Sequence, residues 1–258
     1  MNRLQEVFNN KKAFIPFITA GDPSIDVTEQ LVLQMAEAGA DLIELGIPFS
    51  DPVAEGPVIQ EADIRALSAG TTTDLIFSMV KRVHQTCLVP IAFMTYANPI
   101  FTYGTDRFMK NCREVGIDAV IVPDVPFEER EELKPYCDKY GVCLISMIAP
   151  TSKERIRMIA KEAEGFLYCV SSLGVTGVRG EIDDTVETMI KSVKNEKDIP
   201  CAIGFGISTP EQAARMAEYA DGVIVGSAIV KIIAEYGHEC ISPVVEYIHQ
   251  MKNSLKIV

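Results

Sequence analysis

Residues 40–57 read ADLIELGIPFSDPVAEGP, a short apolar segment that runs into a loop rich in proline and other turn residues. In an extended strand the side chains alternate between two faces, so Leu42 and Glu44 share one face. Glu44 then points into an interior, where a carboxyl group needs a raised pKa, a buried partner or a catalytic role. The loop carries a second acid, Glu55, and the pair favours proton chemistry.

Seven further apolar segments with strand character alternate with helical patterns along the chain. They are residues 13–19, 91–95, 119–122, 143–148, 166–171, 201–205 and 222–225. Dividing 258 residues among eight strand–helix units gives roughly 32 residues each, which is typical of a (β/α)₈ barrel. We therefore predict an α/β fold, one TIM barrel domain over residues 1–258. A doubly wound sheet is the alternative, but no Gly-x-Gly-x-x-Gly follows the first strand.

Several helices can be delimited by their end signals and by their apolar spacing. Leu4, Val7 and Phe8 predict an extra N-terminal helix, and a short helix is expected over residues 228–235 after the eighth strand. Asp184, with Glu187 three residues later, predicts a helix start. Another start is predicted where Thr209 can cap and Pro210 takes the first helical position. Further helical segments are expected at residues 59–69, 75–83 and 108–115.

Composition and charge limit the class of partner. The chain has 24 basic and 36 acidic residues, a net charge of −12, and no Lys/Arg run that would follow a phosphate backbone, so nucleic acid is a poor partner. Its seven cysteines are scattered without a Cys-x-x-Cys, which is typical of reduced thiols in a cytoplasmic protein. No signal peptide and no membrane-spanning run is expected.

Glycines at the ends of the last two strands indicate a phosphate site. Gly206 follows the seventh strand, and Gly226 and Ser227 follow the eighth, directly before the short helix. Backbone N–H groups at such a helix start can bind an anion, although the glycines could equally serve only tight turns. A third glycine-rich stretch, residues 174–180 with Arg179, has the composition of a lid or of a plain surface loop.

Other side chains near the predicted strand ends have less decisive roles. Tyr96 and Tyr168 could line an aromatic pocket or could be core residues. Asp124 could support the site or cap a loop. The three histidines lie away from the strand ends, so neither a histidine-based metal site nor a Ser-His-Asp triad is expected.

Seven strings, in order and at their intervals, resemble the alpha chains of tryptophan synthase over nearly the whole length. They are FITAGDP, ELGIPFSDPVAEGPVIQ, MTYANPIF, VPDVP, LGVTG, GFGIS and GSAIVKII. The resemblance implies a (β/α)₈ barrel that cleaves indole-3-glycerol phosphate to indole and glyceraldehyde 3-phosphate. It also implies an alpha2beta2 complex with a beta chain that holds pyridoxal phosphate, and no cofactor in this chain.

The resemblance also assigns roles to single residues. It implies that Glu44 is the main acid–base group and Glu55 the second catalytic acid. The implied substrate-binding residues are Phe17, Tyr96, Tyr168 and Phe205 around the indole, the lid residue Thr176, and Gly177, Gly206, Gly226 and Ser227 at the phosphate. One position departs from the family pattern LADG, because residues 53–56 read VAEG and Glu55 replaces an Asp.

Three functions remain open from the sequence. The first is a working lyase, and the second is a phosphate-binding regulatory partner of a beta chain with little turnover, which the longer Glu55 suggests. The third is another phosphate-binding barrel enzyme of aromatic biosynthesis. Apolar and proline-rich residues at the predicted mouth, namely Pro48, Phe49, Pro52, Val53 and residues 98–101, favour a docking face for a beta chain.

Overall fold

The computed structural model of the chain describes residues 3–170, 179–204 and 206–257. Within these ranges nine parallel strands form one sheet in the order β5-β4-β3-β2-β1-β9-β8-β7-β6. The strands are β1 (Ala13–Thr19), β2 (Ile43–Gly46), β3 (Ile91–Met94), β4 (Ala119–Ile121), β5 (Cys143–Leu144), β6 (Ser146–Ile148), β7 (Leu167–Val170), β8 (Cys201–Gly204) and β9 (Gly222–Val225).

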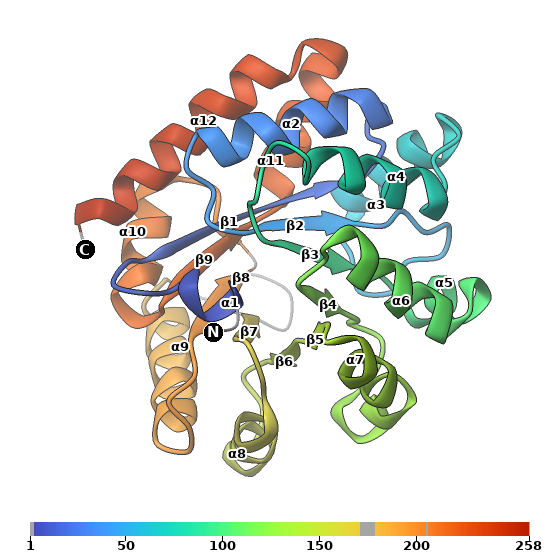
Figure 1. Cartoon of the computed structure of the whole chain (residues 1–258). Coiled ribbons are helices and arrows are strands. Elements are labelled where there is room, and N and C mark those ends of the chain that lie inside the picture. The colour runs from blue at the N-terminus through green and yellow to red at the C-terminus, as the bar shows by residue number, and fades with distance from the viewer. Residues whose placement is uncertain (1–2, 171–178, 205, 258) are drawn as a thin grey trace.

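The sheet closes into a barrel because its two end strands are one piece of chain. Only Ile145 separates β5 from β6, and its backbone N–H donates to the carbonyl of Val120 at 2.9 Å. The first half of this stretch pairs with β4 and the second half with β7, so it links both ends of the sheet. The predicted eight-stranded barrel is therefore confirmed, with its fifth strand assigned in two parts (Figure 1).

The helices form a ring around the strands, as Figure 1 shows. They are α1 (Arg3–Glu6), α2 (Ile25–Glu37), α3 (Pro57–Ser68), α4 (Thr73–Val83), α5 (Ala97–Tyr103), α6 (Thr105–Val115), α7 (Lys134–Tyr140), α8 (Lys153–Glu162), α9 (Arg179–Lys194), α10 (Pro210–Tyr219), α11 (Ser227–Tyr236) and α12 (Ile241–Ser254), with 3₁₀ turns η1 (Phe127–Glu132), η2 (Gly237–Glu239) and η3 (Leu255–Ile257). None of the helices in the described ranges has the length and apolar character needed to span a membrane.

Side chains on alternate strand positions fill the barrel interior. This inner cluster contains small and medium residues such as Ala13, Leu42, Ala92 and Ala119, with larger ones such as Phe166. Leu4 and Val7 of the N-terminal segment belong to the same cluster, and the ring of Phe8 lies 5.4 Å from that of Phe166. The predicted N-terminal helix is confirmed, and the segment that contains it covers one end of the barrel, so a substrate must enter at the other end, where the strands finish.

The helix-end predictions had mixed outcomes. The start at Thr209 is confirmed, since its hydroxyl accepts from the N–H of Gln212 in a reciprocal capping box. The start at Asp184 is wrong, because α9 already begins at Arg179 and Asp184 lies inside it. Gly180 did not prevent helix formation there, and one glycine lowers helix stability by only about 1 kcal/mol relative to Ala.

Candidate active site

A cavity of about 420 Å³ opens at the C-terminal ends of the strands. Side chains from β1, β2, β3, β7 and β9 line it, together with the loop before α3 and the first turns of α11. Seven residues that the sequence singled out come together here: Phe17, Glu44, Glu55, Tyr168, Gly206, Gly226 and Ser227.

Glu44 sits on β2 with its carboxyl group facing the barrel interior. It lies beside Phe17 of β1 and Ala92 of β3 in the strand register, and it is only 1% exposed. Neither carboxyl oxygen has a hydrogen-bond partner in the described part of the chain. Burial, and secondly the negative charge of Glu55, raises the pKa of Glu44 to about 8, so the group carries a proton at neutral pH.

Two glycines make room for the aromatic walls of the cavity. A Cβ on Gly46 would lie 2.7 Å from the ring of Phe17, and a Cβ on Gly204 would lie 2.6 Å from the hydroxyl of Tyr168. Any larger residue would push these rings into the space that a ligand needs. Burial, and secondly the charge of Glu44, raises the pKa of Tyr168, so its hydroxyl stays neutral.

The loop that carries Glu55 is fixed on both sides of this residue. The N–H of Ala54 donates to the hydroxyl of Tyr96 at 3.0 Å, and the side chain of Gln60 donates to the carbonyl of Glu55 at 2.8 Å. Tyr96 is buried but is not among the residues that line the cavity. In this structure it braces the loop that carries Glu55 from behind.

Asp124 acts as a cap beside this tyrosine. Its two carboxylate oxygens lie 3.0 and 3.2 Å from the N–H of Ala97, the first residue of α5. A carboxylate satisfies the free N–H groups at a helix start and interacts favourably with the helix dipole. The loop-capping interpretation of Asp124 is therefore confirmed, and the cap holds the backbone next to Tyr96.

A third acid, Asp63 of α3, lies next to Glu55, and the sequence interpretation missed it. Burial, followed by the charge of Glu55 and a hydrogen bond with it, raises the pKa of Asp63 to about 8. Burial also raises the pKa of Glu55, which the hydrogen bond from Asp63 opposes. The buried face of α3 holds Ile59, Ala62 and Ala66, so helical spacing around Asp63 could have revealed a buried acid.

Another part of the cavity lining is built from backbone and from one cation. Gly206 has a φ of +77°, a conformation that favours glycine, and Gly226 directly precedes the first residue of α11, Ser227. The first N–H groups of a helix have no partner within it and attract anions. Among the described residues that line the cavity, Lys231 is the one basic side chain. The cavity lining thus combines acids from β2 and the loop before α3 with a positive potential at the start of α11.

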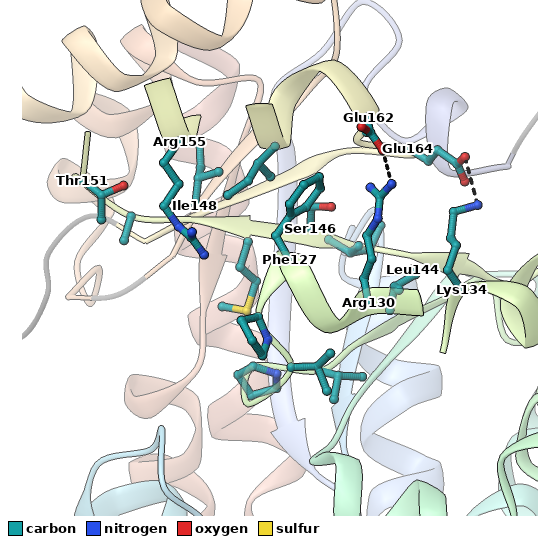
Figure 2. Close-up of a pocket in the computed structure, with 18 residues that line it drawn as sticks. Phe127, Arg130, Lys134, Leu144, Ser146, Ile148, Thr151, Arg155, Glu162 and Glu164 are labelled. Atoms are coloured by element: carbon teal, nitrogen blue, oxygen red, sulfur yellow. Dashed lines mark hydrogen bonds and ion pairs between the residues drawn. The ribbon is translucent and has the colours of Figure 1, made fainter. Parts of the chain in front are cut away.

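A second cavity of about 200 Å³ adjoins the first at Pro123 and Met147, between η1, α7 and α8. Figure 2 shows that its basic side chains already have acidic partners, since Arg130 pairs with Glu162 and Lys134 with Glu164. Arg155 likewise pairs with Glu128. Because these cations are neutralised, an anionic substrate is better served by the first cavity.

Side chains around the mouth only partly match the predicted docking face. Val53 is 80% exposed and Phe101 48% exposed, whereas Pro48 and Ile100 are buried. The predicted exposure is wrong for Pro48 and Ile100, and Ile100 belongs to the large hydrophobic cluster formed by strand and helix residues. An apolar residue next to a proline can equally point inward, so exposure was not determined by the sequence pattern.

Some predicted site residues lie outside the described part of the chain. These are Thr176, Gly177, Phe205 and the lid stretch up to residue 178, while Arg179 and Gly180 begin α9.

Comparison with known proteins identifies the family. The family model for the tryptophan synthase alpha chain matches residues 4–256. The chain belongs to the tryptophan synthase alpha chain family. It is 46% identical to the tryptophan synthase alpha chain of Lacticaseibacillus casei over 252 residues, which cover 98% of this chain and 95% of that protein. Membership makes the chain a carbon–carbon lyase of tryptophan biosynthesis.

Solved structures agree with this assignment. Tryptophan synthase subunit alpha of Legionella pneumophila superposes with a TM-score of 0.91 at 38% identity, covering all of both chains. A chain from the tryptophan synthase a2b2 complex of Pyrococcus furiosus superposes with a TM-score of 0.86 at 37% identity, covering 93% of this chain and 98% of that one. The family therefore includes members solved in complexes, which supports a beta-chain partner.

The buried carboxyl group predicts a pH-dependent stability. Since the pKa of Glu44 rises from its ordinary 4.5 to about 8 on folding, the stability it contributes is complete below about 4.5 and is lost as the pH rises towards 8. Glu44→Gln has no proton to lose. As the pH rises across this window, the free energy of unfolding of Glu44→Gln should therefore increase relative to that of the wild type by up to about 1.4 kcal/mol per pH unit.

Urea denaturation at several pH values between about 5 and 8 measures this difference. Glu61→Gln, at an exposed acid on α3, is the matched control and should track the wild type. A gap between Glu44→Gln and the wild type that does not change with pH would contradict a buried, protonated Glu44.

Proposed function

We propose that the chain cleaves indole-3-glycerol phosphate to indole and glyceraldehyde 3-phosphate, with Glu44 as general acid and base and Glu55 as the second catalytic carboxylate. One observation carries the assignment. A buried, protonated carboxyl group, Glu44, has no hydrogen-bond partner among the described residues and faces a cavity whose lining at the start of α11 suits a phosphate. A group kept in this state can donate a proton and then accept one.

The reaction needs two proton transfers and no oxidant or added water. Protonated Glu44 donates to C3 of the indole ring. The resulting carboxylate then removes the proton of the adjacent hydroxyl, which becomes the aldehyde carbonyl as the bond to C3 breaks and its electrons return to the ring. Glu44 is protonated again at the end. Glu55 accepts a hydrogen bond from the indole N–H while positive charge develops on the ring.

The dimensions and walls of the cavity suit this substrate. Its volume of about 420 Å³ lies within the range of ligand sites, about 300–1,000 Å³. Phe17 and Tyr168 supply flat apolar surface for the indole ring. The start of α11 and Lys231 suit the phosphate group by hydrogen bonding and by charge.

We further propose that the working assembly is an alpha2beta2 heterotetramer in which the beta chain holds pyridoxal phosphate and this chain binds no cofactor. The exposed Val53 lies two residues before Glu55, so a partner resting on this loop would also constrain the catalytic carboxylate. Phe101 adds exposed apolar surface after β3.

Replacing the acid–base group tests the function directly. Glu44→Gln keeps the shape of the side chain and removes its proton chemistry, so turnover should fall by at least about 100-fold while substrate binding is retained. Release of glyceraldehyde 3-phosphate from indole-3-glycerol phosphate measures turnover, and calorimetry measures binding. Glu61→Gln serves again as the control. Retention of more than a few per cent of wild-type turnover would refute the role of Glu44.

The docking face predicts a selective loss of activation. Val53→Asp places a charge on the apolar loop and should weaken stimulation of cleavage by a beta chain at least tenfold, with little change in the activity of the isolated chain. Leu88→Asp is the matched control, because Leu88 is 77% exposed but lies near Arg3 at the closed end of the barrel. Equal losses in both variants, or no loss in either, would argue against this face.

A further inference from the structure

The acid on α3, Asp63, is unusual in its surroundings. It is 5% exposed and shares the buried face of the helix with Ala62 and Ala66. Arg65, the basic residue of the same helix, is already engaged, because its guanidinium binds both oxygens of Asp22 at 2.8 Å. Asp63 is thus left facing other acids.

The hydrogen-bond partners of Asp63 are the carboxyl group of Glu55 and the backbone N–H of Phe49. Two carboxyl groups can form a hydrogen bond only if one of them carries a proton. Asp63 is the more deeply buried of the two and also faces the negative charge of Asp22, so the proton belongs on Asp63. Glu55 is then the carboxylate that accepts it.

The second oxygen of Glu55 remains available. Its Oε2 is buried and has no hydrogen-bond partner among the described residues, and the residue lines the cavity. One oxygen held from behind and one left free is the arrangement needed to receive a substrate N–H.

We propose that Asp63 is a positioning residue that keeps the proton of this pair and holds Glu55 as a carboxylate aimed at the cavity. The inference rests on the proposed function, since it concerns the second catalytic acid. It also accounts for the departure at residues 53–56. Glu55 is one methylene longer than the Asp of the LADG pattern, and the hydrogen bond to α3 fixes the longer side chain.

Other charged or titratable groups surround the pair. Glu44 faces it from β2, Asp22 from the loop after β1, and Tyr96 from the end of β3. Asp124 acts on Tyr96 from the loop after β4. Arg65 stays committed to Asp22, and Lys231 lines the same cavity from α11. The pKa of Glu44 and that of Asp63 are each raised to about 8, so both groups contribute to the alkaline fall in activity.

The experiment compares Asp63→Asn with Asp63→Ala, each alone and combined with Glu55→Gln. Asn keeps an N–H donor on an isosteric side chain, so kcat should stay within a few-fold of the wild type. Ala removes the donor, and kcat should fall roughly 10- to 100-fold with little change in KM. In the double variant, Asp63→Ala should lower kcat no further than Glu55→Gln does alone, because no carboxylate remains at position 55 for Asp63 to hold.

The pH profile separates positioning from a merely structural role. In the wild type, kcat should fall at alkaline pH with the loss of two protons, and in Asp63→Asn with the loss of one. The proposal would be overturned if the alkaline slope of the kcat profile were the same in Asp63→Asn as in the wild type. It would also be overturned if Asp63→Asn and Asp63→Ala lowered kcat equally, or if the effects of Asp63→Ala and Glu55→Gln on kcat multiplied.

A measurement that needs no substrate distinguishes failure of the proposed function from failure of the role proposed for Asp63. If the wild type does not cleave indole-3-glycerol phosphate, the proposed function fails, but titration of a ¹³C-labelled Glu55 carboxyl group by NMR still tests Asp63. The pKa of Glu55 should be higher in Asp63→Ala than in Asp63→Asn, because only Asn stabilises the carboxylate. Equal pKa values would overturn the role of Asp63 whatever the activity.

Discussion

The burial of one carboxyl group, Glu44, inside a closed parallel barrel is the constraint on which the remaining site depends. An ionised carboxylate at a position 1% exposed, and without a hydrogen-bond partner among the described residues, would be strongly destabilising, so the group keeps its proton at neutral pH. The fold itself produces this state. Strand alternation turns Glu44 inward, and the N-terminal segment with Leu4 and Val7 covers the other end of the barrel.

Proton transfer in the cavity also depends on where the acidic and basic side chains around it lie. Acids gather on α3 and the loop before it, and one of them, Asp63, holds its proton so that Glu55 does not have to. The start of α11 and Lys231 line the same cavity. Elsewhere, cations such as Arg65 are neutralised by buried or nearby acids, so the start of α11 with Lys231 is the part of the cavity lining that attracts an anion.

Sequence reasoning predicted the parts of this arrangement that depend on local periodicity. Alternation around Glu44, the strand–helix count and the cap at Thr209 each follow from spacing of two, about 32 or three residues. Sequence reasoning failed for features that are determined by tertiary packing. The predicted helix start at Asp184 was wrong, because α9 begins earlier, at Arg179, despite the cap signal at Asp184. The burial of Ile100 depended on neighbours from other elements. Asp63 was missed because its partner, Glu55, becomes a neighbour only after the loop folds back.

The protonation of Glu44 can be observed without any assumption about the substrate. Infrared difference spectra between the wild type and Glu44→Gln isolate the C=O stretch of a protonated carboxyl group, which can be followed across the pH range. The account predicts a band that persists at neutral pH and disappears with a midpoint near the pKa of about 8. A midpoint near the ordinary value of 4.5 would show that the buried group is ionised at neutral pH, and would contradict the central claim.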